Sequence, residues 1–257
     1  MDLSNLFFKI NYRIVGFRLS IINFILKKYL PNNFKKTFNF NYEVFYNKRY
    51  NCYLSNLCVK YGSDKGSNDN KKKIYNDELR NAHNYTDFYS LLFDNCRTKF
   101  KKVFECGIGK NNTDKKNFGP SLRVWRDYFP NAIIYAADID KNLIFNEKRI
   151  KSYYCDQTSK KSIKIMWNKI KVRNFDLIID DGLHRFEAGR SFFENSYNKL
   201  AKGGIYIIED VRNRCLTKYK NYFKDKNIDF QFILLKSKKK DVLPYDQSDN
   251  NLILIRK

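Results

Sequence analysis

The chain has 257 residues and carries 50 lysines and arginines against 27 aspartates and glutamates, which gives a formal net charge of +23. This length suits one large α/β domain with an added segment, and the charge favours anionic partners, although a compositional bias of the genome toward lysine would raise it equally well. The chain has only two histidines, which excludes a histidine-rich metal site. Its six cysteines form no Cys-x-x-Cys pair, so we expect free thiols in a reducing cytoplasm.

The N-terminal segment, residues 3–30, is apolar but interrupted by basic residues, so no uninterrupted run approaches the span of a bilayer. Apolar side chains recur at helical spacing from Ile10 to Phe24 and predict a basic amphipathic helix. We expect this helix to pack on its own domain or to form a homo-oligomer contact, with the inner membrane surface as the alternative partner. We therefore divide the chain into an N-terminal helical segment with a linker, residues 1–57, and a main domain, residues 58–257.

A loop and a helix precede the first strand of the main domain. The loop at residues 61–66 is turn-forming and contains Gly62 and Gly66. Aromatic and leucine side chains at roughly helical spacing then predict a helix over residues 83–93. His83 stands at the start of this helix and is a candidate for chemistry, although a lone histidine is more often structural.

Residues 102–109 have the form of a first strand that runs into a glycine turn, where a ligand can approach the backbone closely. A dinucleotide fingerprint would need a third glycine near position 112, and Asn112 stands there. S-adenosylmethionine also needs such a turn, together with a carboxylate at the end of the next strand for its ribose. The apolar run at residues 133–138 supplies that carboxylate, because it ends at Asp138. The pattern therefore favours S-adenosylmethionine over a nicotinamide cofactor.

The remaining sequence alternates strands and helices. Helices are expected over residues 121–129, 159–170, 186–200 and 215–227. Further strands are expected at residues 152–155, 175–179, 204–208, 230–235 and 252–255. The last two strands are separated by a polar loop and predict an antiparallel hairpin at the sheet edge. Together these elements predict an α/β fold with a doubly wound, mostly parallel, seven-stranded Rossmann-like sheet.

Two of the expected strands end in paired carboxylates. These four acids are Asp180, Asp181, Glu209 and Asp210. Because the carboxyl ends of neighbouring parallel strands meet at one edge of a sheet, the acids should lie close together, and a divalent metal would relieve their repulsion. His184 follows the first pair and makes this edge a candidate site for chemistry. The alternative is that the acids only cap helices or pair with lysines.

Seven motifs occur in order between residues 58 and 211. They are YGSDKG (61–66), ECGIG (105–109), GPSLRVW (119–125), DID (138–140), DQ (156–157), DDGLH (180–184) and GGIYIIEDV (203–211). Together they resemble the class I S-adenosylmethionine-dependent methyltransferases. Within these, the similarity is closest to the metal-dependent O-methyltransferases that act on sugars of macrolide antibiotics and to related proteins of bacterial glycan clusters. The polar insertion at residues 110–117 departs from the family pattern.

The resemblance implies a cofactor site. The amino-acid end of S-adenosylmethionine would lie against Glu105, Gly107 and Gly109, and its ribose against Asp138. The other cofactor-binding positions that the resemblance implies are Tyr61, Ser63, Asp64, Lys65, Ser121, Ile139, Asp156, Gln157 and Asp180.

The resemblance also implies a metal and a base. Asp181, Glu209 and Asp210 match the family's magnesium ligands, and these hard oxygen donors suit Mg²⁺ or Mn²⁺. His184 matches the general base, and Asp181 is the second catalytic residue. Because a sulfonium methyl is already electrophilic, such a site has mainly to align an acceptor oxygen and remove its proton.

We therefore expect a cytoplasmic, metal-dependent O-methyltransferase. Its acceptor would be an anionic small molecule or nucleotide-linked glycan, methylated on a sugar hydroxyl or a phosphate- or phosphoramidate-type group of a capsule or other surface-glycan precursor. One alternative is a nucleic-acid methyltransferase, which the net charge suggests but which the missing Asn/Asp-Pro-Pro-Tyr motif disfavours. The other is a non-catalytic cofactor-binding assembly protein.

Overall fold

The computed structural model describes residues 42–45, 52–66, 73–75, 78–80, 83–109, 118–236 and 250–257. The amphipathic helix predicted within residues 3–30 and the 110–117 insertion lie outside these residues. In the described part of the chain, no helix is both long and apolar enough to cross a membrane. Asn41–Lys257 forms one compact unit.

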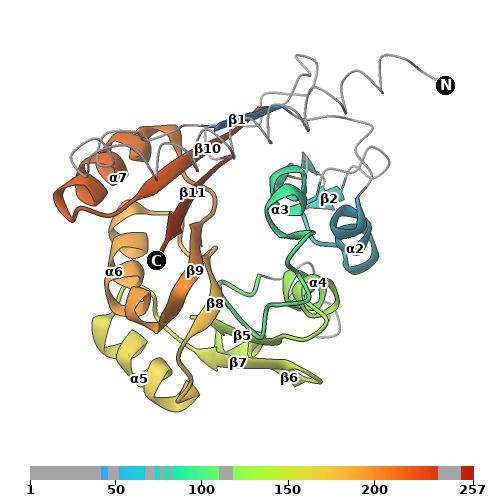
Figure 1. The fold of residues 1–257 in the computed structure, drawn as a ribbon. Coiled ribbons are helices and arrows are strands. Elements are labelled where there is room, and N and C mark those ends of the chain that lie inside the picture. Colours follow the sequence, from blue (N-terminus) through green and yellow to red (C-terminus); the bar gives the residue numbers. More distant parts are fainter. Residues whose placement is uncertain are drawn as a thin grey trace. The chain divides into compact units, whose positions relative to one another are not determined.

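Among the described residues, nine strands form the main sheet, in the order β1-β10-β11-β9-β8-β4-β5-β7-β6 (Figure 1). These strands are β1 (Tyr42–Phe45), β4 (Lys102–Cys106), β5 (Ile133–Asp138), β6 (Asn146–Glu147), β7 (Ile150–Tyr154), β8 (Phe175–Asp180), β9 (Leu200–Ile208), β10 (Phe230–Lys236) and β11 (Asn251–Arg256). Neighbours pair in parallel, except that β11 runs antiparallel to β9 and β10 and β6 runs antiparallel to β7. A separate two-stranded ribbon is made of β2 (Lys73–Tyr75) and β3 (Glu78–Arg80).

The seven expected strands occupy the middle of this sheet, which confirms the predicted fold class. The structure adds two strands that the sequence analysis did not identify: β1 pairs in parallel with β10, and the two-residue β6 pairs with β7. The hairpin of β10 and β11 is antiparallel, as predicted, but it does not form the sheet edge, because β1 lies beyond β10.

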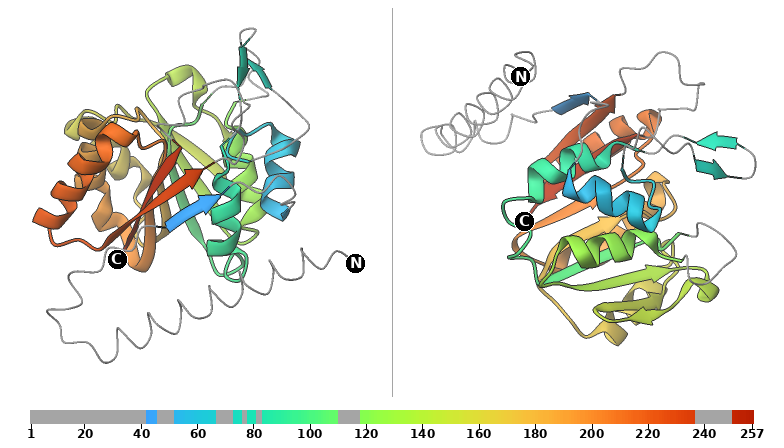
Figure 2. Two further views of the ribbon diagram at one scale, coloured as in Figure 1. Left: turned by 90° about the horizontal axis from the view of Figure 1, so that it is seen from above. Right: turned by 90° about the vertical axis from the view of Figure 1, so that its right-hand side faces the viewer.

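Helices cover both faces of the sheet (Figures 1 and 2). They are α2 (Tyr53–Tyr61), α3 (Tyr85–Phe93), α4 (Pro120–Tyr128), α5 (Lys160–Ile170), α6 (Phe186–Ser196) and α7 (Asn213–Asp225). The domain boundary that we predict at residue 58 falls inside α2. Because successive side chains of a strand point to opposite faces, Val103 packs in the core under α2, α3 and α4, whereas Phe104 packs in the core under α5, α6 and α7. The central strands are therefore buried on both sides, as their apolar runs predict.

This arrangement fixes where a site can form. Strands β4, β5, β8 and β9 are neighbours and run in parallel, so their carboxyl ends meet at one edge of the sheet. Asp138 and Asp180 are the last residues of β5 and β8, and Glu209 and Asp210 directly follow β9. The acidic positions singled out in the sequence therefore lie at a common edge, where open α/β sheets bind ligands.

Candidate active site

A cavity of about 390 Å³ opens at this edge. Most positions that the sequence analysis assigns to the site lie on its wall. These are Ser63, Asp64, Lys65, Gly107, Gly109, Ser121, Asp138, Ile139, Asp156, Gln157, Asp181, His184, Glu209 and Asp210. The predicted positions Tyr61, Glu105 and Asp180 are not among the lining residues. The fold thus brings together residues from seven separate motifs around one space.

Position 107 requires a glycine, because the turn after β4 approaches the turn after β8 closely at this point. The φ of Gly107 is +94°, and a Cβ atom at this position would lie 2.0 Å from the carbonyl oxygen of Asp181. One hydrogen bond joins the two turns, because Asp181 N–H donates to the carbonyl of Cys106 (2.8 Å). The glycine turn is also tied to β5, since Gly107 N–H donates to the carbonyl of Ala137 (2.8 Å). The glycine turn after β4 therefore supports the backbone of Asp181.

Replacement of Gly107 by alanine is expected to lower the free energy of unfolding by about 3 kcal/mol or more, since it adds a backbone clash to an unfavourable φ. Gly109→Ala is the matched control, because Gly109 also has a positive φ (+64°) but no described atom lies within 4 Å of its added Cβ. This control should cost only about 1 kcal/mol. Urea denaturation of both variants measures the difference, and equal losses would contradict the close approach.

Asp138 is held by the backbone at the end of β5. Its Oδ2 accepts a hydrogen bond from Ile108 N–H (2.8 Å), and its Oδ1 accepts one from Asp140 N–H (2.8 Å). Each carboxylate oxygen still has a lone pair for a further donor. The carboxylate is therefore fixed in orientation on the cavity wall and able to accept the two hydroxyls of a ribose.

Asp180 lies beneath the wall and supports it. Its carboxylate accepts hydrogen bonds from the Gln157 amide and from Gly182 N–H, and the Gln157 Oε1 accepts one from Leu183 N–H (2.8 Å). Burial raises the pKa of Asp180 to about 7. Asp180 therefore positions Gln157, which itself lines the cavity, rather than facing the cavity directly.

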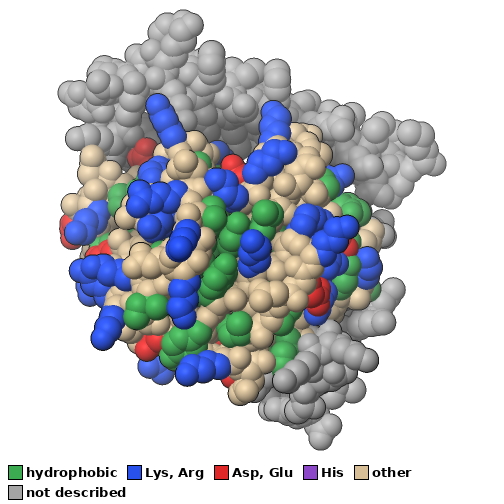
Figure 3. Space-filling view, turned by 90° about the horizontal axis from the view of Figure 1, so that it is seen from below, with side chains coloured by type: hydrophobic (Ala, Val, Ile, Leu, Met, Phe, Trp, Pro, Cys, Tyr) green, Lys and Arg blue, Asp and Glu red, His purple; other side chains and the backbone are tan. Residues whose placement is uncertain are grey.

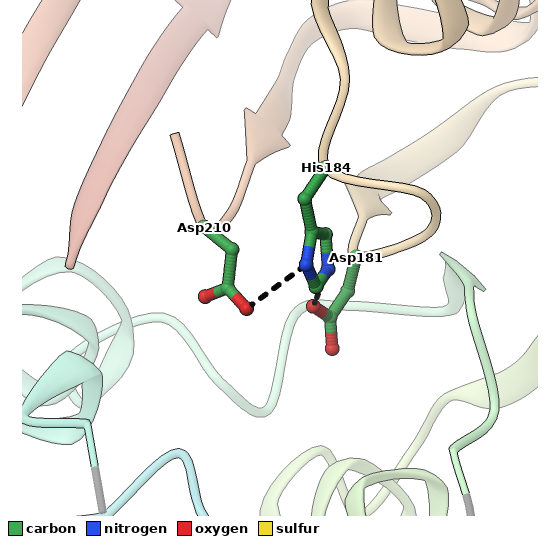
Figure 4. A group of neighbouring side chains, drawn as sticks. All are labelled: Asp181, His184 and Asp210. Carbon is green, nitrogen blue, oxygen red and sulfur yellow. Dashed lines mark hydrogen bonds and ion pairs between the residues drawn. The ribbon is translucent and has the colours of Figure 1, made fainter. Parts of the chain in front are cut away.

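Asp181, His184 and Asp210 form a compact group on the wall (Figure 4), in which one ligand atom from each lies within 4.8 Å of the others. His184 Nε2 is 3.2 Å from Asp181 Oδ1, and His184 Nδ1 is 3.4 Å from Asp210 Oδ2. His184 and Asp210 both have positive φ, +54° and +51°, a backbone region that such residues adopt mainly where the surroundings impose it. Two carboxylates and an imidazole in partly exposed positions are a donor set that fits a divalent cation.

The two carboxylates also control the charge of His184. Burial alone would lower the pKa of His184, but the hydrogen bond with Asp181 and the charge of Asp210 raise it to about 9. In this arrangement the ring is an imidazolium at neutral pH, with an N–H toward each carboxylate. For His184 to accept a proton, its carboxylate neighbours must be neutralised by another positive charge.

In the metal-free protein, His184 is expected to titrate near pH 9 in a proton NMR experiment on the ring hydrogens, which two histidines make easy to assign. The pKa of His184 is raised above its unfolded value of about 6.5, so protonated His184 stabilises the folded protein. This contribution to the free energy of unfolding is complete below about pH 6.5 and is lost as the pH rises through about 9. Mg²⁺ should shift the titration to lower pH. A metal-free pKa near 6.5 would show that the carboxylates do not act on the ring.

Glu209 faces a different partner from its neighbour Asp210. Glu209 is buried, its Oε1 accepts a hydrogen bond from Tyr89 O–H (2.6 Å), and its Oε2 pairs with Lys65 Nζ. Lys65 Nζ also lies 2.6 Å from Asp181 Oδ2 and 3.2 Å from Glu105 Oε1. The structure therefore groups Asp181 and Asp210 with His184, and Glu209 with Lys65. The inclusion of Glu209 among the metal ligands stays a prediction.

Glu105 and Tyr61 do not line the cavity. Glu105 is fully buried, and its Oε2 accepts a hydrogen bond from Ser121 O–H (2.9 Å). Burial is the main reason that its pKa rises to about 7. Tyr61 O–H donates to Asp127 and thus faces helix α4. Glu105 therefore supports two wall residues, Ser121 and Lys65, whereas the partners of Tyr61 lie on α4 and do not line the cavity.

His83, a candidate for chemistry in the sequence but not one of the predicted site residues, also lines the cavity. The Asn250 amide nitrogen donates to Asn84 Oδ1 (2.8 Å) and to the Leu235 carbonyl (3.1 Å), so Asn250 Oδ1 must accept from His83 Nδ1 (2.9 Å). His83 Nε2 is then directed toward Asp210 Oδ1 at 3.6 Å. Tyr85 O–H also donates to Asp210. The sequence signal for this pair of contacts is that His83 and Tyr85 stand only two residues apart, at the start of the helix predicted over residues 83–93.

Comparisons with known proteins identify relatives of this chain. No protein-family model matches the chain. The chain is 29% identical over 159 residues to the 8-demethyl-8-alpha-L-rhamnosyl tetracenomycin-C 2'-O-methyltransferase of Streptomyces olivaceus, which covers 62% of this chain and 38% of the relative. It is 32% identical over 129 residues to the demethylmacrocin O-methyltransferase of Streptomyces fradiae, covering 50% and 32%. The chain is related to the sugar O-methyltransferases.

This relationship confirms the resemblance predicted from the motifs. The fold agrees as well, because a structure of the MycE methyltransferase of the mycinamycin pathway, in complex with Mg and SAH, superposes with a TM-score of 0.56 at 22% identity. That comparison covers 81% of this chain and 55% of MycE. The chain spans about a third of the length of the curated sugar O-methyltransferases that it matches.

Proposed function

We propose that this protein is an S-adenosylmethionine-dependent, divalent-metal-dependent O-methyltransferase that acts on a sugar hydroxyl. The observation that carries the proposal is that one cavity joins the backbone-held Asp138 with the group of Asp181, His184 and Asp210. Asp138 is suited to bind a ribose. The group of Asp181, His184 and Asp210 is suited to bind a cation and to accept a proton. Relatives named for the methylation of glycoside hydroxyls support this reaction class.

The cofactor would extend along the carboxyl ends of β4, β5 and β7. Its ribose would be held by Asp138, its adenine would lie near Asp156 and Gln157, and its amino-acid end would lie near Gly107 and the loop at residues 63–65. All of these positions line the cavity. The methyl group would then point toward the part of the wall that contains His184.

The metal would be held by Asp181 and Asp210, with Glu209 as the third ligand that the family resemblance implies. A bound divalent cation supplies positive charge that stabilises an oxyanion, and it also offsets the carboxylates that keep His184 protonated. His184 would then take the proton of the acceptor hydroxyl. The acceptor oxygen forms the new bond to the methyl carbon, the carbon–sulfur bond breaks, and sulfur keeps the electron pair as S-adenosylhomocysteine is released.

We further propose that the acceptor is anionic, such as a nucleotide-linked or phosphate-bearing precursor of a capsule or other surface glycan. The net charge of +23 supports an anionic acceptor, because a positive field raises the local concentration of anions. Figure 3 shows Lys and Arg side chains scattered over the face that it presents, with fewer Asp and Glu side chains between them. The acceptor is thus selected in part by the field of the whole protein and not by the cavity alone.

The first test is cofactor binding. The wild-type protein should bind S-adenosylhomocysteine in calorimetry, and Asp138→Ala should weaken binding by about 10²-fold or more, because two hydrogen bonds to a charged group are lost. Asp140→Ala is the matched control, since Asp140 lies two residues on and its side chain caps Asn142 N–H at the surface. Unchanged affinity in Asp138→Ala would show that the ribose is bound elsewhere.

The second test is turnover. Methyl transfer from labelled S-adenosylmethionine in the presence of Mg²⁺ should be measured with nucleotide sugars, phosphorylated glycan precursors, neutral methyl glycosides and RNA. The proposal expects transfer to a sugar-containing acceptor, faster for the anionic ones. Transfer to RNA alone would replace the proposal by a nucleic-acid methyltransferase.

A further inference from the structure

Lys65 is an unusual side chain in this site, because it is almost completely buried although it lies at the edge of a cavity. The residue is 3% exposed. Its loop is fixed by two backbone hydrogen bonds, from Thr86 N–H to the Lys65 carbonyl (3.2 Å) and from His83 N–H to the Asp64 carbonyl (2.7 Å). Since burial of an unpaired ammonium is very unfavourable, the partners of Lys65 must hold it there.

Its partners are three carboxylates from three different strand ends. They belong to Glu105, Asp181 and Glu209. Glu105 and Glu209 are 0% and 1% exposed, so Lys65 is the nearby cation that compensates them. One ammonium thus serves three acids, and burial raises the pKa of Glu105 to about 7 and the pKa of Glu209 well above its ordinary value.

Asp181 connects Lys65 with the candidate metal group. Its Oδ2 is 2.6 Å from Lys65 Nζ, and its Oδ1 is 3.2 Å from His184 Nε2. A cation bound by Asp181 and Asp210 would therefore share one carboxylate with the Lys65 ammonium. If Glu209 is also a ligand, the cation would share two, because Glu209 Oε2 pairs with Lys65 as well. Two positive charges on one carboxylate repel each other.

We propose that Lys65 is an internal counter-ion that keeps Asp181 and Glu209 assembled in the metal-free protein and competes with the divalent cation for them. Lys65 is thus a positioning residue that lowers the metal affinity of a site that is already formed. This inference rests on the proposed metal site and adds to it a residue that limits the strength of metal binding.

The test is the affinity for Mn²⁺ alone, measured by calorimetry or by electron paramagnetic resonance. Lys65→Met should bind Mn²⁺ about 10- to 100-fold more tightly than the wild type, because the competing charge is gone while a side chain of similar length fills the space. Lys65→Arg, which keeps the charge, should stay close to the wild type. Lys60→Met is the matched control, because Lys60 is exposed and pairs with Asp127 instead; its Mn²⁺ affinity should not change.

The sign of the change separates this role from a purely structural one. If Lys65 only supported the loop, its loss would weaken Mn²⁺ binding, and that result would overturn the inference. If Lys65→Met unfolds without metal, thermal melts decide: recovery of the folded state by Mn²⁺ supports competition for the same acids, and no recovery overturns it. A wild-type protein that binds no Mn²⁺ would refute the proposed metal site itself, whereas tight wild-type binding that Lys65→Met weakens refutes only the role of Lys65.

Discussion

Replacement of His184 is expected to lower the rate of methyl transfer by about 10²- to 10⁴-fold, the usual contribution of a positioned general base. His184 is the partly exposed imidazole on the cavity wall beside Asp181 and Asp210. Without it, the acceptor hydroxyl would have to lose its proton to water. Single-turnover kinetics at saturating S-adenosylmethionine and Mg²⁺ measure this step directly.

The backbone at His184 determines which variant is informative. With φ at +54°, an alanine would be strained, whereas asparagine tolerates this left-handed region. His184→Asn should therefore keep the fold and the Mn²⁺ affinity while losing the rate. Full activity in the folded variant would exclude His184 as the base. A large loss of Mn²⁺ affinity would instead make His184 a metal ligand.

Removal of the metal is expected to abolish turnover while leaving cofactor binding largely intact. The cation would be held by Asp181 and Asp210, on a part of the wall separate from Asp138, which holds the ribose. A chelator should therefore stop methyl transfer, and S-adenosylhomocysteine should still bind in calorimetry. Turnover that persists in a strong chelator would leave a metal-free methyltransferase that works by proximity alone.

Asp210→Asn provides the matching genetic test. Asp210 also has a positive φ (+51°), which asparagine accepts, so the fold should persist. Loss of a carboxylate ligand should weaken Mn²⁺ binding by about 10²-fold or more, and high Mg²⁺ should restore part of the activity. Asp127→Asn is the control, since Asp127 pairs with Arg126 and Lys60 away from the cavity. Equal effects of the two substitutions would contradict the metal assignment.

Much of the fold follows from local pattern. Apolar runs such as residues 175–179, which only Asp176 interrupts, are nearly continuous because strands in a parallel sheet are covered on both faces. That pattern is visible without knowledge of the partner strands. The edge strand β1 is different. It pairs with β10 from the other end of the chain, and nothing in its four residues specifies that partner.

The position of the candidate site was also predictable. Asp138 and Asp181 stand at the ends of apolar runs, and parallel strands bring such ends to one edge. The close approach that makes Gly107 necessary was visible only as a glycine turn, because the atom it avoids belongs to Asp181 on another strand.

The sequence by itself determined the order of the seven central strands and of the helices that follow β4, the chemical types at the strand ends and the resemblance to sugar O-methyltransferases. Only the tertiary structure decided which polar side chains face each other: Glu209 toward Lys65, Asp210 toward His184, and His83 toward Asn250. The physical reason is that the spacing of apolar residues shows which face of a segment packs on the core, and this spacing can be read within the segment alone. The partner of a polar side chain beyond a strand end depends on turns from distant parts of the chain, which come together only when the sheet has formed.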